Sequence, residues 1–382
     1  MGIILVRSHD TTPVPAIRRH RRTTRTAMAF ATVTVAAASL VACGDDEGSG
    51  ERSSSTVLVD GKPLVVVTYS VLGDVVSQLV GDAATVRVII PNGQDPHDYA
   101  PSAQDVEQMN GAALVVANGL ALEEGMEDVL DTLGDDGVPV FYATDHVELR
   151  ELGAEEQAIE AAAHDEGATE EASHDEEAAH DEEAAHDEET AHDEETAHDE
   201  EAAHDEEHAH GSEDPHVWTD PNVMAVVAAA LAAELETVLG AQLDEQLAAV
   251  EAEMVELDAE VREIMSAVPA GECRLVTGHE SLGYFADRYG CELIGAVIPS
   301  LSSTAETSAK DLSELLEVTE AAGVKAIFTE VGTPQAVAEQ VADEVGVPLI
   351  ELPSHNLPET GGYQAFVVEL ATKVAAGLTG SA

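Results

Sequence analysis

The chain has 382 residues and a formal net charge of −60 at pH 7, from 76 Asp and Glu against 16 Lys and Arg. This length is enough for about two domains at roughly 100–200 residues each. The acidic balance argues against binding to nucleic acid or to an anionic lipid surface, because both partners need a basic patch.

The first 42 residues have the pattern of an export signal. The basic run RRHRRTTRT precedes the apolar stretch AMAFATVTVAAASLVA, which is too short for a comfortable transmembrane helix. The stretch ends in LVAC and turns polar at once, which resembles a bacterial lipobox with Cys43 as the lipidated first residue. We predict a lipoprotein signal peptide at 1–42 and a flexible Gly/Ser-rich tether at 43–61. The alternative is an ordinary signal peptide with an incidental cysteine.

Residues 62–150 alternate between predicted strands and helices. The strands are LVVVTYS, ATVRVII, AALVVAN and VPVFYA, with helices at VLGDVVSQLVG, 102–110 and 121–133 between them. Such βαβα alternation implies a parallel sheet with helices on both faces. Residues 151–212 break the pattern, because the unit HDEE(A/T)(A/T) recurs every six residues there and no apolar residue larger than Ala follows Ile159. We predict that this insert is disordered, since it cannot bury a core.

A second ordered block begins at DPHVWTDP. Asp220 is a good helix cap, with Pro221 at the first helical position, and the helix should run to 239. One long helix at 240–269 then leads to an alternating block at 270–382, with strands at 273–277, 291–298, 325–329 and 347–350 and a last helix at 362–378. The fold class is therefore α/β. Two lobes, each a parallel sheet flanked by helices, are joined by the long helix, and residues 62–150 and 213–239 form the first lobe. A cleft should lie at the carboxyl ends of the strands.

The two remaining cysteines, Cys273 and Cys291, begin neighbouring predicted strands. An exported protein can keep a disulfide, so a Cys273–Cys291 bridge is possible; the alternative is two buried thiols. Neither cysteine is expected to bind metal, because nothing near them has the spacing of paired thiolates.

Four histidines fall in predicted loops beside strands or a helix cap. His97 is in DPHDYAPS, His216 in DPHVWTD, His279 in VTGHESLGYF and His355 in IELPSHNL. Two come from each lobe, so a cleft between the lobes could gather all four, and four imidazoles suit a tetrahedral Zn²⁺. The Asp of each Asp-Pro-His step can cap the turn or orient an imidazole. A lone histidine is more often a surface or core residue, and we interpret His146 as part of the start of the insert.

Several long motifs carry a resemblance to a known family. VVVTYSVLGDVVSQLVG, PNGQDPHDYAPS, DPHVWTDP and GHESLGYFADRYG closely resemble the zinc/manganese class of solute-binding lipoproteins of bacterial ABC importers, over nearly all of 62–378 except the insert. The resemblance implies a metal between two lobes, with ligands His97, His216, His279 and His355. His rather than Glu at 279 points to the zinc branch. His355 stands where that family usually has Asp, so water or Glu330 could complete the shell instead, or Glu330 could brace a ligand.

The resemblance also implies a function and a location. We expect an extracytoplasmic protein that binds Zn²⁺ as its transported ligand and delivers it to the permease and ATPase of an ABC importer. It should be a monomer and not an enzyme, anchored by its lipid to the outer face of the bacterial cell membrane. Zinc members of the family often carry a His-rich loop, and we expect the insert to be an accessory zinc binder through His164, His174, His180, His186, His192, His198, His204, His208 and His210. Each of its sites should be weaker than a preformed cleft, because a disordered chain loses entropy on binding. A solvated acidic linker is the alternative.

Other functions remain open. The same architecture could serve Mn²⁺ or Ni²⁺, and affinity order alone would favour copper. A secreted zinc hydrolase could use Glu280 as a base, but no HExxH or nucleophile elbow is present. A surface adhesin has no supporting sequence feature. Tyr99, Trp218 and Tyr284 flank the expected ligands and form either cleft walls or ordinary core.

Overall fold

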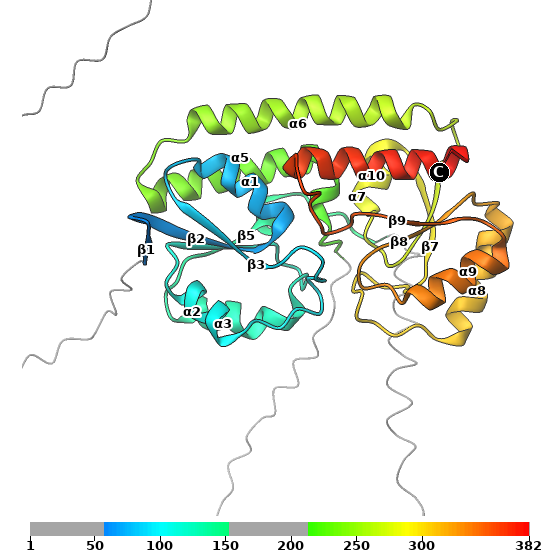
Figure 1. Cartoon of the computed structure of the whole chain (residues 1–382), viewed down its shortest axis with the longest axis horizontal. Coiled ribbons are helices and arrows are strands. Elements are labelled where there is room, and N and C mark those ends of the chain that lie inside the picture. The colour runs from blue at the N-terminus through cyan, green and yellow to red at the C-terminus, as the bar shows by residue number, and fades with distance from the viewer. Residues whose placement is uncertain (1–56, 153–212, 382) are drawn as a thin grey trace, which may run out of the picture. The chain divides into compact units, whose positions relative to one another are not determined.

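The computed structural model describes residues 57–152 and 213–381. Cys43, the signal peptide and the nine histidines of the insert lie outside the described residues, so the predictions about them stay predictions. The described residues form two α/β lobes, each with parallel strands and covering helices (Figure 1). This is the fold class that the sequence predicted.

The first lobe is built on one five-stranded sheet whose central strand is β2 (Lys62–Tyr69). The strand reads KPLVVVTY and is buried without interruption from Leu64 to Tyr69, as expected for a strand covered on both faces. Its parallel partners are β3 and β4, and β4 pairs in parallel with β5; these strands span Thr85–Ile90, Leu114–Ala117 and Val140–Tyr142. Their carboxyl ends therefore meet at one edge of the sheet.

The start of the first lobe differs from the predicted tether. Residues 57–61 belong to the fold, because β1 (Leu58–Val59) pairs antiparallel with the first residues of β2. The turn between the strands is Asp60–Gly61, and both residues have positive φ, 54° and 80°. Asp-Gly favours this kind of two-residue hairpin turn. The dipeptide was a local signal for a hairpin that the composition of the segment obscured.

Helices cover the first sheet. They are α1 (Ser70–Val80), α2 (Ala103–Asn110), α3 (Glu127–Asp135) and α5 (Pro221–Leu239). The helix expected at 121–133 begins later, because Leu120 and Ala121 have φ of 52° and 56°, in the left-handed region that a helix cannot include. A short 3₁₀ turn at Glu124–Met126 precedes α3.

Helix α5 begins where the sequence predicted. The Asp220 carboxylate accepts a hydrogen bond from the N–H of Asn222 at 2.8 Å, Pro221 occupies the first turn, and Gly240 ends the helix in the left-handed region. The helix is long and apolar enough to cross a membrane by composition alone. Met224, Leu231 and other residues on one face of α5 are nevertheless buried in the core, so α5 is a core helix in this fold.

The long helix predicted between the lobes is α6 (Asp244–Met265), which runs above both lobes in Figure 1. Its buried residues recur every three or four positions, from Val250 to Met265, which is the stripe of an amphipathic helix. This stripe packs on α5 and on the last helix, α10 (Gly362–Thr379). Helix α10 also contacts α1, so the end of the chain packs against the first lobe as well as the second.

The second lobe contains two parallel strand pairs, β6 with β7 and β8 with β9. The strands span Arg274–Thr277, Glu292–Ala296, Ile327–Thr329 and Leu349–Glu351. Helices of this lobe are α7 (Gly283–Tyr289), α8 (Ala309–Ala322) and α9 (Gln335–Val345). As in the first lobe, each strand leads at its carboxyl end into a loop with polar residues.

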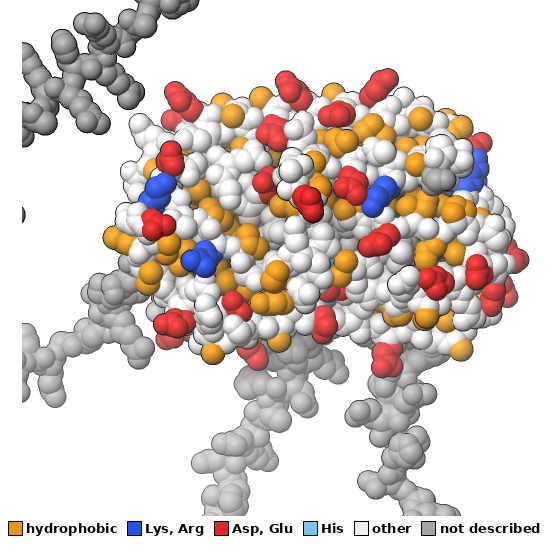
Figure 2. Space-filling view, in the orientation of Figure 1, with side chains coloured by type: hydrophobic (Ala, Val, Ile, Leu, Met, Phe, Trp, Pro, Cys, Tyr) orange, Lys and Arg blue, Asp and Glu red, His pale blue; other side chains and the backbone are white. Residues whose placement is uncertain are grey.

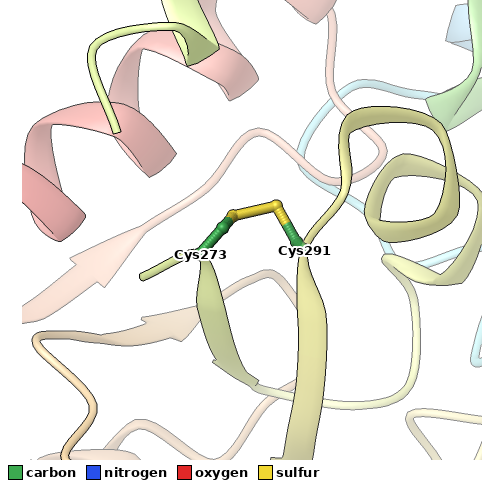
Figure 3. Close-up of a disulfide and its surroundings, with 2 residues drawn as sticks. All are labelled: Cys273 and Cys291. Atoms are coloured by element: carbon green, nitrogen blue, oxygen red, sulfur yellow. A yellow bond between two sulfur atoms is a disulfide. The ribbon is translucent and has the colours of Figure 1, made fainter. Parts of the chain in front are cut away.

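Cys273 and Cys291 form a disulfide in the structure, with their Cα atoms 4.6 Å apart (Figure 3). They lie just before β6 and β7, at the same end of this parallel pair. The bond closes a loop that contains β6, His279 and α7. This loop is thereby tied at the end opposite to the histidine.

The surface retains the acidic character of the sequence. On the face shown in Figure 2, Asp and Glu side chains of the described residues are spread widely and Lys and Arg are few. The acidity is therefore a property of the folded lobes and not only of the repeat.

Candidate metal centre

The four predicted histidines come together in one buried cluster. His97 follows β3, His216 precedes the 3₁₀ turn Val217–Thr219, His279 follows β6 and His355 follows β9. Their exposed fractions are 3%, 0%, 0% and 2%. The ring centroids are 5.1 to 6.4 Å apart for all six pairs. Each lobe contributes two rings: His97, His279 and His355 lie in loops at the carboxyl ends of parallel strands, and His216 lies in the loop before α5.

The tightest contact in the cluster joins the two lobes. Nε2 of His216 lies 3.2 Å from Nε2 of His279. On the far sides of these rings, Nδ1 of His216 lies 2.8 Å from Oδ1 of Asp214, and Nδ1 of His279 lies 2.6 Å from Oε1 of Glu330. A carboxylate only accepts hydrogen bonds, so Nδ1 of His216 carries the proton in this arrangement, and the close Glu330 carboxylate favours a proton on Nδ1 of His279 as well.

This arrangement has a chemical consequence. In the neutral tautomers, both Nε2 atoms present lone pairs toward each other at 3.2 Å. Such a contact is repulsive unless a proton or a metal cation lies between the nitrogens. Neighbouring nitrogens in a zinc tetrahedron with Zn–N bonds of about 2.0–2.1 Å would be about 3.3 Å apart. The observed spacing fits a shared cation.

The other two histidines complete a compact set. His97, His279 and His355 each offer a ring nitrogen within 4.8 Å of the others. Among the described residues, neither ring nitrogen of His355 has a hydrogen-bond partner, and its nearest carboxylate oxygen is Oδ1 of Asp95 at 3.9 Å. Nδ1 of His97 lies 3.8 Å from Oε1 of Glu124. Three imidazoles thus present ring nitrogens close to one another, and His216 joins them through the contact of its Nε2 with Nε2 of His279.

Glu330 takes the position of a brace. Its Oε1 accepts hydrogen bonds from the backbone N–H of His279 and from the hydroxyl of Ser281, both at 3.0 Å, beside the contact with the His279 ring. These contacts fix both the loop and the imidazole after β6. Of the two roles that the sequence left open for Glu330, the geometry supports bracing.

Charge and burial act differently on the individual rings. Burial lowers the pKa of His216, and the nearby Asp214 carboxylate does not offset it. Burial, followed by the charges of His279 and His216, lowers the pKa of His355 well below its ordinary value. The pKa of His279 is raised above its ordinary value. Burial alone would lower this pKa, but the charge and contact of the Glu330 carboxylate outweigh burial. His216 and His355 are therefore held neutral, the form that binds metal.

The loop that carries His216 is fixed by Asp214, in the role that the Asp-Pro-His pattern predicted, and by Asn118 and Glu123, for which the pattern predicted no role. Asp214 accepts the backbone N–H of His216 at 2.9 Å, and the side-chain amide of Asn118 donates to the carbonyl of Pro215 at 2.9 Å. The buried carboxylate of Glu123 in turn accepts the backbone N–H of Asn118 at 2.8 Å. Burial raises the pKa of Glu123 despite this and other hydrogen bonds. The available signal was the segment NGLALEE, with one Asn and two Glu, directly after the buried strand β4.

The three aromatic residues have different places. Trp218 is fully buried, with its ring centroid 5.2 Å from that of His216 and 5.7 Å from that of His355, so it forms a wall of the cluster. The hydroxyl of Tyr284 donates to the carbonyl of Asp214 at 3.2 Å, which supports the His216 loop. Tyr99 instead directs its hydroxyl at Asp105, 3.3 Å away, in the first turn of α2.

His146 lies apart from the cluster. It belongs to the 3₁₀ turn Ala143–His146 after β5, and its ring stacks on Phe141 with centroids 4.5 Å apart. We interpreted it from the sequence as part of the start of the insert. In the structure it ends an ordered element of the first lobe.

Comparison with known proteins gives an independent view of the chain. The protein-family model described as "Zinc-uptake complex component A periplasmic" matches residues 65–377. The zinc-binding protein TroA of Treponema pallidum is 26% identical over 292 residues, which are 76% of this chain and 78% of TroA. The manganese ABC transporter substrate-binding lipoprotein PsaA of Streptococcus pneumoniae is 35% identical over 130 residues, 33% of this chain and 40% of PsaA.

Solved structures have the same fold. The periplasmic zinc-binding protein TroA from Treponema pallidum superposes with a TM-score of 0.62 at 25% identity, covering 84% of this chain and 99% of TroA. A crystal structure of ZnuA superposes with a TM-score of 0.59 at 19% identity, covering 82% of this chain and 98% of ZnuA. The ZnuA likeness supports the fold alone.

Proposed function

Because the chain belongs to the family of periplasmic zinc-uptake component A, the metal-binding component of ABC importers, we propose that it binds Zn²⁺ through His97, His216, His279 and His355 and delivers it to the importer's permease. The observation that carries the proposal is the pair of Nε2 atoms at 3.2 Å, each on a ring whose Nδ1 faces a buried carboxylate. Two separate lobes present metal-binding lone pairs to one point.

Zinc is the metal that these donors suit best. Zn²⁺ prefers a tetrahedral set of nitrogen or sulfur ligands, whereas Mn²⁺ prefers carboxylate and other oxygen ligands. The cluster offers four imidazoles, and the carboxylates Asp214 and Glu330 are occupied with the outer nitrogens of two rings. Mn²⁺ is the second candidate because PsaA, a relative, is named a manganese protein. Ni²⁺ and Cu²⁺ also accept imidazole ligands, so selectivity must be measured.

Binding in this centre depends on carboxylates that do not touch the metal. Asp214 and Glu330 fix the tautomer and orientation of their imidazoles and make the ligand nitrogens more basic. Their negative charges also compensate a dication held by neutral ligands. The wall formed by Trp218 excludes water from one side of the cluster. No bond in a substrate needs to be broken, and we propose no enzymatic activity.

The remaining proposals concern residues outside the described ranges. We propose that Cys43 carries the lipid that anchors the protein to the outer face of the cell membrane, and that the nine histidines of the insert are weaker accessory zinc sites. We also propose that the protein acts as a monomer. The insert is joined to the centre by short connections, because Glu151 and Glu213 form a β-bridge and Asp214 donates its N–H to the Arg150 carbonyl at 2.9 Å. A deletion inside the insert therefore leaves both ends in place.

Zinc titration calorimetry of the mature chain, with a competing chelator to reach tight affinities, tests the proposal. The chain is measured with and without residues 155–212, and the variant His97→Ala is compared with the control His146→Ala, which changes an exposed histidine outside the cluster. We expect one tight site that survives the deletion and His146→Ala but is lost in His97→Ala. Mn²⁺ and Ni²⁺ titrations under the same conditions measure the metal preference.

Two outcomes of these titrations would contradict the proposed function. If deletion of 155–212 removes all tight zinc binding, the insert is the zinc receptor and the four-histidine centre is wrong. If the mature chain binds Mn²⁺ more tightly than Zn²⁺, the centre is correct and the proposed metal is wrong.

A further inference from the structure

Two carboxylates of the first lobe each lie between His97 and a hydroxyl group of the second lobe. Asp95 accepts the backbone N–H of His97 on Oδ1 at 3.1 Å and the Ser303 hydroxyl on Oδ2 at 2.5 Å. Glu124 has Oε1 3.8 Å from Nδ1 of His97 and accepts the Thr304 hydroxyl on Oε2 at 3.0 Å. One oxygen of each carboxylate therefore faces the histidine and the other faces the opposite lobe.

The two hydroxyls belong to a segment that we call the serine segment, residues 300–304, which follows β7. It is held in shape by its own hydroxyls: Ser300 Oγ accepts the N–H of Ser302 at 3.1 Å, and Ser302 Oγ accepts the N–H of Thr304 at 3.1 Å. The carbonyl of Ser300 accepts the N–H of Glu280 at 2.9 Å. Because Glu280 follows His279 directly, the serine segment is attached to the loop of a proposed ligand in the second lobe.

The second lobe also leaves a narrow space for the Asp95 carboxylate beside Gly332. Gly332 has a φ of 95° and lies against both groups of this contact: a Cβ added there would be 1.9 Å from Oδ2 of Asp95 and 2.9 Å from Cβ of Ser303. The Asp95 side chain is only 9% exposed. A glycine in this conformation thus leaves room for the carboxylate to reach Ser303.

We propose that Asp95–Ser303 and Glu124–Thr304 form a latch between the lobes that positions His97 and sets the rate at which the bound metal leaves. The inference rests on the proposed function of the four-histidine centre. Separating the lobes at the serine segment breaks two hydrogen bonds with ionised acceptors, which are stronger than neutral ones. It also removes the partners of both carboxylates beside His97. Asp95, Glu124, Ser303 and Thr304 are positioning residues, because they act through His97.

The latch should influence dissociation more than association, as most changes within one binding site do. The double variant Ser303→Ala/Thr304→Val removes both hydroxyls but no metal ligand. We expect it to release zinc about tenfold faster than the wild type, since hydrogen bonds to charged groups are among the stronger ones and only part of their free energy is regained from water. Thr304→Ser keeps the hydroxyl, so it should release zinc at about the wild-type rate, whereas Thr304→Val should release zinc faster.

The test measures zinc release from the mature chain by stopped-flow mixing with excess chelator, together with the visible spectrum of the Co²⁺-loaded protein. The matched control is Thr307→Val, which removes a nearby hydroxyl whose hydrogen bond, to the Val297 carbonyl at 2.9 Å, stays within the second lobe. We expect the control to release zinc at the wild-type rate. The Co²⁺ spectrum of every variant should keep the intensity of a four-coordinate site, because the ligands are intact.

A double-mutant cycle of Glu124→Gln with Thr304→Val sharpens the test, and the two changes should be non-additive if they break the same contact. Wild-type release from Ser303→Ala/Thr304→Val, an additive cycle, or loss of the four-coordinate Co²⁺ spectrum in that variant overturns the latch. If the wild-type chain itself has no tight site that depends on His97, the proposed function fails. A wild-type chain that binds tightly while the latch variant releases at the same rate overturns the latch alone.

Discussion

The side of the metal centre formed by His216 and His279 is constructed differently from the side formed by His355. His216 and His279 each direct Nδ1 at a buried carboxylate, at 2.8 and 2.6 Å. His355 is buried to the same degree, but among the described residues no carboxylate oxygen lies as close to either of its ring nitrogens. Its nearest carboxylate oxygen is 3.9 Å away. Burial is common to the two sides, and bracing is not.

The difference separates two ways of preparing an imidazole for a metal. A braced ring has a fixed tautomer and a fixed direction, so its ligand nitrogen is ready before the metal arrives. The ring of His355 is kept neutral by burial and by neighbouring charges, which lower its pKa, and it is positioned by packing against Trp218. We infer that the His216–His279 side contributes most of the affinity, and the following experiments test this.

The largest effect is expected for His279→Ala. This change removes a braced ligand and leaves the Glu330 carboxylate buried without its imidazole. Structural zinc sites with four ligands bind with about 10–16 kcal/mol, so loss of one ligand should weaken zinc affinity by about a thousandfold. Competition calorimetry measures this against His146→Ala as the control. A loss below tenfold would remove His279 from the ligand set.

The second effect is the loss of the braces themselves. Glu330→Gln and Asp214→Asn keep the shape of the side chains but remove the charge that orients each ring. Loss of such a partner weakens metal affinity by about 10–100-fold. The expected signature is weaker zinc binding with an unchanged stoichiometry. If Glu330→Gln reduces affinity as much as His279→Ala and also alters the four-coordinate Co²⁺ spectrum, Glu330 is a ligand and not a brace.

Substitution of His355 should have a smaller effect than substitution of His279. His355→Ala removes an unbraced ring, and water can take its place in the shell, so we expect a loss of about tenfold to a hundredfold in zinc affinity. His355→Asp puts an oxygen ligand at this position, which should raise affinity for Mn²⁺ relative to Zn²⁺. Both are measured by paired Zn²⁺ and Mn²⁺ titrations. Equal losses in His355→Ala and His279→Ala would show that bracing does not rank the ligands.

The smallest effect is expected outside the centre, at Asp258 on α6. Burial raises the pKa of the Asp258 carboxyl, but hydrogen bonds and charges from Arg288 and Arg262 outweigh burial and hold the pKa below its ordinary value. A carboxyl whose pKa is lowered by folding stabilises the protein above its unfolded pKa of about 3.9, and this stabilisation is lost as the pH falls through the folded pKa. The contribution should be about 1 kcal/mol.

Asp258→Asn therefore serves as a control for general stability. In metal-free protein at pH 7, we expect a Tm about 2–4 °C lower than that of the wild type for a loss of about 1 kcal/mol. The difference should disappear as the pH falls through the lowered pKa of Asp258. Zinc affinity at pH 7 should stay within about twofold of the wild type. If Asp258→Asn weakens zinc binding as much as Glu330→Gln, then global stability rather than bracing explains both results.

Much of the fold follows from local patterns. The buried run of β2, the Asp220–Pro221 start of α5 and the periodic stripe of α6 are all visible in the sequence, and the structure agrees with them. The local exceptions were the hairpin at Asp60–Gly61 and the delayed start of α3 after Leu120. Both depend on positive φ values, which the hydrophobic pattern does not encode.

Local patterns also predicted part of the metal centre, but not all of it. Asp-Pro-His steps and histidines after strands indicated which side chains to consider, because parallel strands direct their following loops to one edge. The hydroxyl partners of the two carboxylates beside His97 were less visible: Ser303 meets Asp95 across 208 positions of the chain, and Thr304 meets Glu124 across 180. No spacing rule connects residues that far apart. Cys43 and the histidines of the insert, outside the described residues, rest on sequence alone.

The sequence by itself determined the two α/β blocks, the long helix between them and the four histidines with their loop positions, because each depends on a pattern within a few tens of residues. Tertiary structure decided which of its possible roles Glu330 takes, that His355 has no such brace, and that the carboxylates beside His97 meet hydroxyls of the other lobe. The physical reason is the short range of the hydrogen bond. A contact of about 3 Å exists only after separate elements have packed to that accuracy, and no local pattern contains that distance.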